Sequence, residues 1–191
     1  MLYLTSKDWR FCARWTLATT LAIALCNALH IVGFFGGPIV LAIAQGWALR
    51  SYWRHYRLWA LATLIGGYLA LLELLLCVLF APWPVFVSVF VCGAIAAGPQ
   101  AWVLRRHRQP WRRWPLMNAV ILTLTLFWFL PDMLDASIYG NTRPAWEWVT
   151  RAALTGLIGG SLKGLALTQV LQPRALGGDK DERVRDRLPR N

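Results

Sequence analysis

A short stretch rich in small residues occurs three times in the chain, and each copy leads to one polar position that is followed four residues later by a leucine. The copies begin at Gly36, Gly93 and Gly156. The polar positions, called slot residues below, are Gln45, Gln100 and Lys163, and the leucines are Leu49, Leu104 and Leu167. An internal repeat of this kind restricts the fold to a few copies of one structural unit.

Composition indicates where these copies fold. Of the 191 residues, 57% are hydrophobic and only 15% are charged, and twelve are tryptophans. A typical soluble domain has about 45–50% apolar and about 25% charged residues. Since a membrane crossing needs about 20 apolar residues, we expect an all-α integral membrane protein with six transmembrane helices. They are expected at about residues 15–29, 38–49, 58–80, 85–104, 114–130 and 148–171.

The basic residues alternate between the two ends of the expected helices. Seventeen of the 20 lysines and arginines lie in the N-terminus, the loops 50–57 and 105–113, and the C-terminal tail. Positive residues are retained on the cytoplasmic side of a membrane. Both termini are therefore expected in the cytoplasm, with the protein in a bacterial inner membrane or a thylakoid membrane. This placement explains the net charge of +11 without a nucleic-acid partner.

The repeat extends to whole helical hairpins. Three of the expected helices begin with Trp-x-Leu, at Trp15, Trp59 and Trp114, close to arginines. This pattern is typical of anchors at the membrane surface. We therefore expect three hairpins, at about 14–50, 58–105 and 113–171, that run in the same direction and are related by a pseudo-threefold axis. They form a transmembrane domain over residues 1–172, and the charged tail 173–191 is expected to be disordered in the cytoplasm.

Two sets of residues are candidates for packing or binding within this bundle. Small residues let helix backbones approach each other in lipid, so five glycines are expected to pack helices: Gly93, Gly98, Gly156, Gly160 and Gly164. Gln45 and Gln100 need partners inside the membrane. They either form interhelical hydrogen bonds or, together with Lys163, form a ring around the bundle axis that binds an anionic head group or solute.

Glu73 is the other charged residue expected within the membrane, and such residues are functional hypotheses by default. It lies about 21 Å from the cytoplasmic face, counted from Trp59, so a direct pair with Lys163 is not expected. We expect instead that Glu73 is protonated, that it is directed towards Asn27 and His30, or that it extends to the outer surface. It completes the candidate ligand-binding set of Gln45, Gln100, Lys163 and Glu73.

No catalytic or metal-binding motif accompanies these residues. The three histidines are scattered along the sequence, and the four cysteines have no CxxC spacing. Asp132, Asp135 and Asn141 form a solvated loop or an outer polar site. A non-enzymatic protein without an identified cofactor is therefore expected. If the protein binds a pigment, the residues expected to reach the metal of a chlorophyll-like molecule are Gln45, Gln100, His30 and Asn27.

The pattern Gly-xxx-Gly-xx-Gln-xxx-Leu-Arg, followed by a Trp-led helix and closing in a Gly-Leu-Ala-Leu copy without glutamine, resembles a group of uncharacterised cyanobacterial-type multi-repeat membrane proteins. The resemblance covers roughly residues 30–171, with Leu41 in place of a glycine in the first copy. It implies the architecture and a photosynthetic host, and it supplies no functional residues.

Two functions remain open from the sequence. The first is an accessory or scaffolding component that packs against another membrane subunit, lipid or pigment. The alternative is a small transporter or solute-binding membrane component with a site near the bundle axis. The expected partners are the lipid bilayer and another membrane protein or a further copy of the chain.

Overall fold

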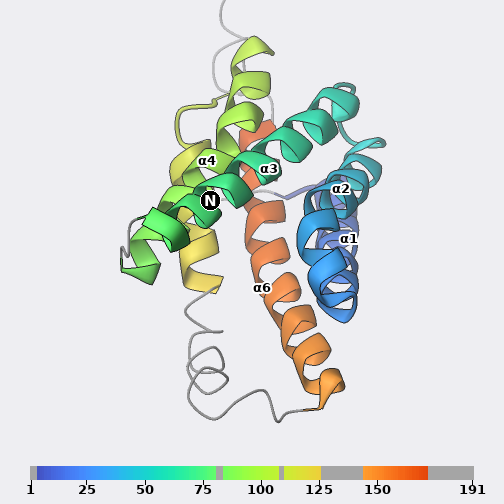
Figure 1. Ribbon diagram of the computed structural model, residues 1–191. Coiled ribbons are helices and arrows are strands. Elements are labelled where there is room, and N and C mark those ends of the chain that lie inside the picture. Colours follow the sequence, from blue (N-terminus) through green and yellow to red (C-terminus); the bar gives the residue numbers. More distant parts are fainter. Residues whose placement is uncertain (1–3, 81–83, 108–109, 126–143, 172–191) are drawn as a thin grey trace, which may run out of the picture.

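The computed structural model describes residues 4–80, 84–107, 110–125 and 144–171, and these residues form helices without any strand (Figure 1). The helices are α1 (Ser6–Ala28), α2 (His30–Leu49), α3 (Tyr56–Phe80), α4 (Val85–Arg106), a helix over Trp114–Thr125, and α6 (Ala145–Leu171). Four of them contain segments long and apolar enough to cross a membrane: Ser6–Ala28, Tyr56–Cys77, Phe86–Arg106 and Trp146–Leu171. The all-α prediction is confirmed for these residues, and the spans indicate an integral membrane protein.

The first helix begins earlier than expected, at Ser6 rather than near Trp15. Thr5 caps this end: its hydroxyl oxygen accepts from the Asp8 amide at 3.3 Å, and the Asp8 carboxylate accepts from the Thr5 amide at 2.8 Å. Such a reciprocal capping box satisfies amides that a helix start leaves free. α2 begins at His30, immediately after Leu29, so the link expected before Pro38 is helical too.

Several expectations lie outside the described residues. They concern the end of the fifth expected helix (126–130), the outer-loop residues Asp132, Asp135 and Asn141, and the charged tail 173–191.

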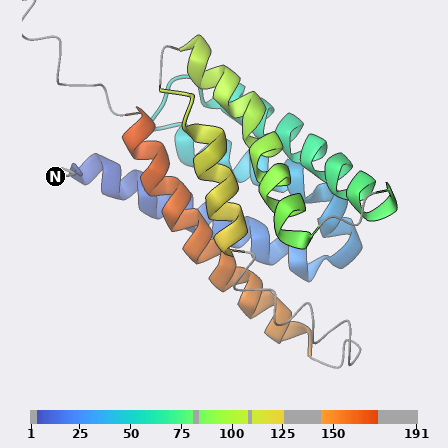
Figure 2. The same cartoon turned by 90° about the vertical axis from the view of Figure 1, so that its left-hand side faces the viewer.

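The described helices pack one against the next. α1 packs against α2 and α6, and α3 packs against α2 and α4. The Trp114–Thr125 helix lies between α4 and α6 (Figure 2). Its Asn118 side chain donates to the Gly93 carbonyl of α4 at 2.6 Å, and Cγ2 of Thr125 lies 2.9 Å from where a Cβ would stand at Gly159 of α6. The contacts therefore form a closed circuit.

Three glycines bring α6 against α1 over two helical turns, from Gly156 to Gly164. A Cβ added at Gly156 would lie 2.7 Å from the Cα of Thr20, and one at Gly160 would lie 3.3 Å from the Cα of Thr16. At Gly164, the added Cβ would lie 3.1 Å from Cδ1 of Trp15. The two backbones thus meet at one-turn steps, which is how small residues drive helix association in lipid.

The other two predicted packing glycines differ from each other. A Cβ at Gly93 would lie 2.8 Å from the Cα of Ala119, so Gly93 packs α4 against the Trp114–Thr125 helix. Gly98 is exposed and has nothing within 4 Å of its Cβ position. The packing expected at Gly98 is therefore not found within this chain, because its side of α4 faces outwards.

The three tryptophans that open the repeats are buried, contrary to the expectation that they anchor the membrane surface. Trp15, Trp59 and Trp114 are at most 1% exposed. Their rings meet edge to face, with centroids 6.3 Å apart for Trp15 and Trp59 and 5.4 Å apart for Trp59 and Trp114. The three leucines that follow the slots are also fully buried in the same core: Leu49, Leu104 and Leu167.

Surface-exposed tryptophans occur two residues after the glutamine slots instead. Trp47 and Trp102 are about half exposed. The Arg50 guanidinium lies 5.8 Å from the Trp47 ring centroid, and the Arg106 guanidinium lies 5.5 Å from that of Trp102. An exposed aromatic ring beneath a cation suits the boundary between lipid and water. These two residues therefore have the environment that the sequence pattern assigned to the buried tryptophans.

The glycine contacts lead to a matched pair of substitutions. Gly156→Ala should destabilise the protein by about 1–3 kcal/mol, the usual range for overpacking, because the new methyl group meets the backbone of α1. Gly36→Ala, in α2, should be neutral or stabilising by up to about 1 kcal/mol, since alanine favours helix and nothing lies within 4 Å of a Cβ at this position. Reversible unfolding in detergent micelles measures both changes, and equal effects at the two positions would contradict the described α1–α6 contact.

Candidate functional site

Gln45 is buried between α2 and α3, and its side-chain oxygen accepts two hydrogen bonds there. Its side-chain oxygen accepts from Nε1 of Trp59 at 3.3 Å and from Oγ1 of Thr63 at 3.1 Å. Trp59 opens α3, and Thr63 follows one turn later on the same face. The first slot residue thus ties its own helix to the tryptophan-led helix that comes next in the chain.

Gln100 makes the corresponding contact one repeat later. Its side-chain oxygen accepts from Nε1 of Trp114 at 2.8 Å, and its amide nitrogen donates to Oγ1 of Thr63 at 2.8 Å. In both cases the tryptophan lies 14 residues after the glutamine. Thr63 bridges the two amides, so Gln45 and Gln100 belong to one buried network that joins α2, α3, α4 and the Trp114–Thr125 helix.

At the third slot the two matching donors lack an acceptor. α6 packs on α1, where Trp15 and Thr19 hold the same relative positions as Trp59 and Thr63 on α3. Gly164 and Gly160 lie against Trp15 and Thr19, respectively. Both polar side chains are buried, and neither Trp15 Nε1 nor Thr19 Oγ1 has a hydrogen-bond partner in the described part of the chain.

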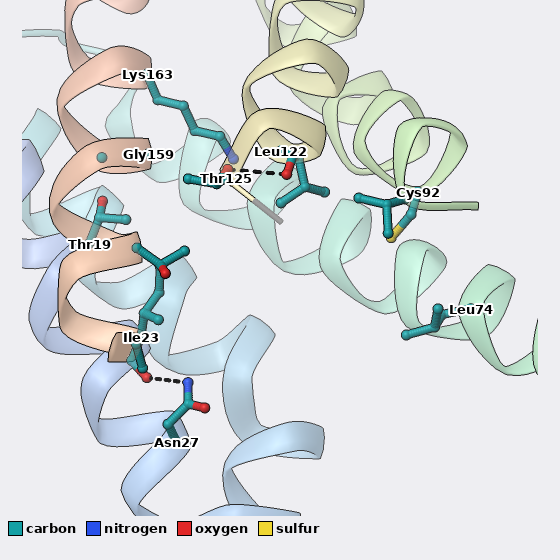
Figure 3. A pocket seen from close by; sticks show the side chains of 13 residues that line it. Thr19, Ile23, Asn27, Leu74, Cys92, Leu122, Thr125, Gly159 and Lys163 are labelled. Carbon is teal, nitrogen blue, oxygen red and sulfur yellow. Dashed lines mark hydrogen bonds between the residues drawn. The ribbon is translucent and has the colours of Figure 1, made fainter. Parts of the chain in front are cut away.

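The identity of the slot residue explains this difference. A glutamine carries an acceptor oxygen, whereas a lysine ammonium carries only donors. Lys163 therefore cannot take the hydrogen bonds that Gln45 takes from Trp59 and Thr63. Figure 3 shows its side chain extending from α6 towards Thr125.

Lys163 reaches into a cavity of about 320 Å³ inside the bundle. The wall comes from α1, α3, α4, α6 and the Trp114–Thr125 helix; its residues include Thr19, Asn27, Leu74, Cys92, Thr125 and Lys163 (Figure 3). Among the described residues of the wall, Lys163 alone carries a charge. The cavity is otherwise mostly apolar, with several hydroxyl groups.

The expected ring of Gln45, Gln100 and Lys163 is therefore not formed. The two glutamines meet through Thr63, and neither lines the cavity that contains Lys163. Equivalent positions in the sequence predicted equivalent surroundings, but a cation cannot replace a carbonyl oxygen in a network of donors. The glutamines tie helices together, whereas Lys163 lines the cavity.

The remaining candidates lie around this cavity or outside the described side chains. Glu73 is half-buried on α3 and accepts from Cys77 Sγ at 3.0 Å; it does not line the cavity. Asn27 lines the end away from Lys163, and its amide donates to the Ile23 carbonyl at 2.9 Å. The side chain of His30 lies outside the described residues. Because the glutamine oxygens are engaged with Trp and Thr donors, neither is offered to a pigment metal.

Thr19 and Thr63 were missed as site residues, although the sequence carries a signal for them. Each repeat places a polar residue four positions after its buried tryptophan, giving Thr19, Thr63 and Asn118. All three are buried. This spacing puts the polar group on the same helix face as the indole. On this face Thr63 donates to the slot residue Gln45, whereas Asn118 donates to the Gly93 carbonyl.

Two of the histidines, which are scattered in sequence, are in contact in the structure. The rings of His55 and His107 stack with centroids 3.4 Å apart, and Trp53 meets both edge to face. They belong to the segment before α3 and to the end of α4. Burial lowers the pKa of His107 below its ordinary value of 6.5, and the neighbouring His55 and Arg106 lower this pKa further.

Tryptophan-to-phenylalanine substitutions separate the hydrogen bonds from the packing. Trp114→Phe removes the donor to Gln100, whereas Trp15→Phe removes a donor without a described acceptor. Trp114→Phe should therefore cost on the order of 1 kcal/mol more than Trp15→Phe. Trp59→Phe should lie between them, since Thr63 still donates to Gln45. The measurement is unfolding of delipidated protein in detergent; an equal loss for all three variants would refute the assigned difference.

The histidine pair gives an expected pH dependence. Since the pKa of His107 is lowered in the folded protein, the unfolded chain takes up this proton first as the pH falls. Stability should therefore decrease as the pH drops through about 6.5 towards the folded-state pKa. His107→Gln should flatten this part of the curve of melting temperature against pH. An unchanged slope in that variant would show that the dependence arises elsewhere.

No family model, curated protein or solved structure matches the chain. The function is accordingly inferred from the cavity, the slot residues and their contacts.

Proposed function

We propose that the chain consists of three repeated hairpins, over about 14–50, 58–105 and 113–171, that cross the membrane six times. Corresponding contacts support this arrangement. Seven residues before each slot, Pro38 meets Gly67, Gly93 meets Ala119, and Gly156 meets Thr20. The partner lies five residues after the leading tryptophan in the last two contacts and one turn further along in the first. Each contact joins one slot helix to the next tryptophan-led helix, and the third returns from α6 to α1. A closed circuit of this kind suits a pseudo-threefold bundle.

The orientation in this proposal follows from charge. The basic N-terminus, the loops 50–57 and 105–113 and the tail lie on the cytoplasmic side, in a bacterial inner or thylakoid membrane. The many exposed apolar side chains of the described helices face lipid, as do Leu61, Ile65, Leu72 and Leu79 along α3. A patch of this extent on a soluble monomer would promote association.

Within this bundle, the protein acts as a non-enzymatic ligand-binding component of the membrane. The observation that carries the proposal is the cavity of about 320 Å³, walled by five helices and containing Lys163. Sites for small molecules are typically about 300–1,000 Å³, mostly apolar, and equipped with a few polar groups. An ionisable residue inside a membrane bundle usually faces such a cavity or a partner. Both features occur here at one place.

An accessory or scaffolding role is the second candidate, and the outer face of α4 favours it. Gly98 is open, and Trp102, one turn away, is about half exposed. A small residue beside a large aromatic one on a lipid-facing surface offers a place for another transmembrane helix. A polypeptide that purifies with the chain in a fixed ratio would support this role, and native mass spectrometry would detect it.

Filling the cavity tests the leading proposal. Thr155 lines the cavity, whereas the neighbouring Leu154 is exposed and does not. Thr155→Phe should reduce the bound ligand at least tenfold because the ring occupies its space, and Leu154→Phe should retain it. Native mass spectrometry of protein released gently from the membrane measures the bound small molecule directly. Equal occupancy in the two folded variants, or no ligand in the native protein, would contradict a ligand-binding cavity.

A further inference from the structure

The third slot is less favourable for folding than the other two. Lys163 stands where a glutamine would accept hydrogen bonds, and the indole of Trp15 and the hydroxyl of Thr19 are left buried without described partners. Unsatisfied buried donors destabilise a fold, as does a cation within the membrane. A substitution that is unfavourable in two ways at a repeated position calls for a functional reason.

The charge of Lys163 has no counterpart among the described side chains. The three carboxylates in the described residues are Asp8, Glu73 and Glu147. Asp8 accepts from Thr5 and Tyr52. Glu73 accepts from Cys77 with Oε1, while its Oε2 is buried without a hydrogen-bond partner in the described part of the chain. Glu147 lies on α6 itself, about 24 Å along the helix from Lys163. None of them lines the cavity.

The cavity is elongated, with its charge near one end. Along α6 its wall extends from Ala152 to Lys163, which is about 16 Å of helix. Thr19 lies in the wall against Gly160, three residues before Lys163, and keeps a buried hydroxyl without a partner in the described part of the chain. Apolar side chains fill most of the remaining wall, among them Ile23, Leu74, Val89 and Leu122. The occupant that matches this distribution has one anionic end and an apolar body.

On the basis of the proposed ligand-binding role, we propose that the cavity holds an anionic amphiphile whose carboxylate or phosphate pairs with Lys163. The Thr19 hydroxyl donates a further hydrogen bond to this anionic group, and the apolar part of the molecule extends along α6 towards Asn27. The third repeat thus gives up a structural hydrogen bond and gains a charge for recognition. Lys163 and Thr19 determine the class of ligand, and the apolar wall determines its shape.

A series of probes with one chain and different head groups tests the ligand class. The probes are dodecanoate, dodecyl phosphate and dodecanol, with acetate and inorganic phosphate as the same anions without a chain. Delipidated protein in a steroid detergent is titrated with each, and native mass spectrometry gives the occupancy. Dodecanoate or dodecyl phosphate should bind at least tenfold more tightly than dodecanol. Acetate and phosphate should bind at least tenfold more weakly than the chain-bearing anions.

Variants at position 163 test the residue. Lys163→Gln should reduce binding of the anionic probes at least tenfold and raise the melting temperature above that of the native protein, because the new oxygen accepts from Trp15 and Thr19. Lys163→Met should lose the binding and melt below Lys163→Gln. The control is Arg50→Gln, which removes one positive charge from an exposed residue outside the cavity. It should bind as the native protein does.

The outcomes separate this inference from the proposed function. If dodecanol binds the native protein as tightly as dodecanoate does, the proposal that the ligand is anionic is wrong, although the cavity is still a binding site. Full binding of the anionic probes to Lys163→Gln would also overturn it. If acetate or phosphate binds as tightly as the chain-bearing anions, the apolar chain does not contribute to binding, and the proposal of an amphiphilic ligand is wrong. Failure of every probe to bind would overturn the ligand class; if the protein released gently from the membrane still carries another small molecule, the proposed function stands, and if it carries none, both are overturned.

Discussion

The hydrogen bond between a slot glutamine and the tryptophan 14 residues later organises the described bundle. Inside a membrane no water is present to satisfy an amide or an indole, so each must find its partner in the protein. Gln45 with Trp59, and Gln100 with Trp114, solve this requirement between successive helices. Because both partners are fixed to helix backbones, the bond also sets the register of one helix against the next.

Thr63 extends these two bonds into a network. It donates to Gln45 and accepts from Gln100, so a single hydroxyl connects both amides. The tryptophan rings pack edge to face beside it, an arrangement that aromatic pairs favour. Hydrogen bonds and aromatic packing together therefore hold the helices in place in this part of the bundle. The cavity lies in another part of the interior, which these contacts do not fill.

The sequence predicted the helices, the repeated slots and the contact stripe of Gly156, Gly160 and Gly164, because helix formation and small-residue spacing are local properties. It misplaced Trp15, Trp59 and Trp114, because an aromatic residue beside arginine has the same pattern whether it faces lipid or the core. It also predicted one ring from equivalent positions. The sequence predicts where a residue lies along its helix. It does not predict where the Lys163 side chain points, because that depends on the donors Trp15 and Thr19, which come near only when α6 packs on α1. The contact of His55 with His107 is non-local in the same way.

The placement of the lysine at the third slot has a physical reason in the packing of α6 on α1. Three residues before the slot, the first two copies have Ala42 and Ala97, whereas the third has Gly160; a glycine directly follows the slot in the first copy (Gly46) and in the third (Gly164). Gly160 and Gly164 put the α6 backbone directly on α1, and this is the most extensive helix pair among α1, α2, α3, α4 and α6. Close backbone contact stabilises helix pairs in lipid without any side-chain hydrogen bond. The junction between the first and last helices can therefore lose the glutamine tie and still hold, which makes it the place in the bundle where a charged residue is tolerated.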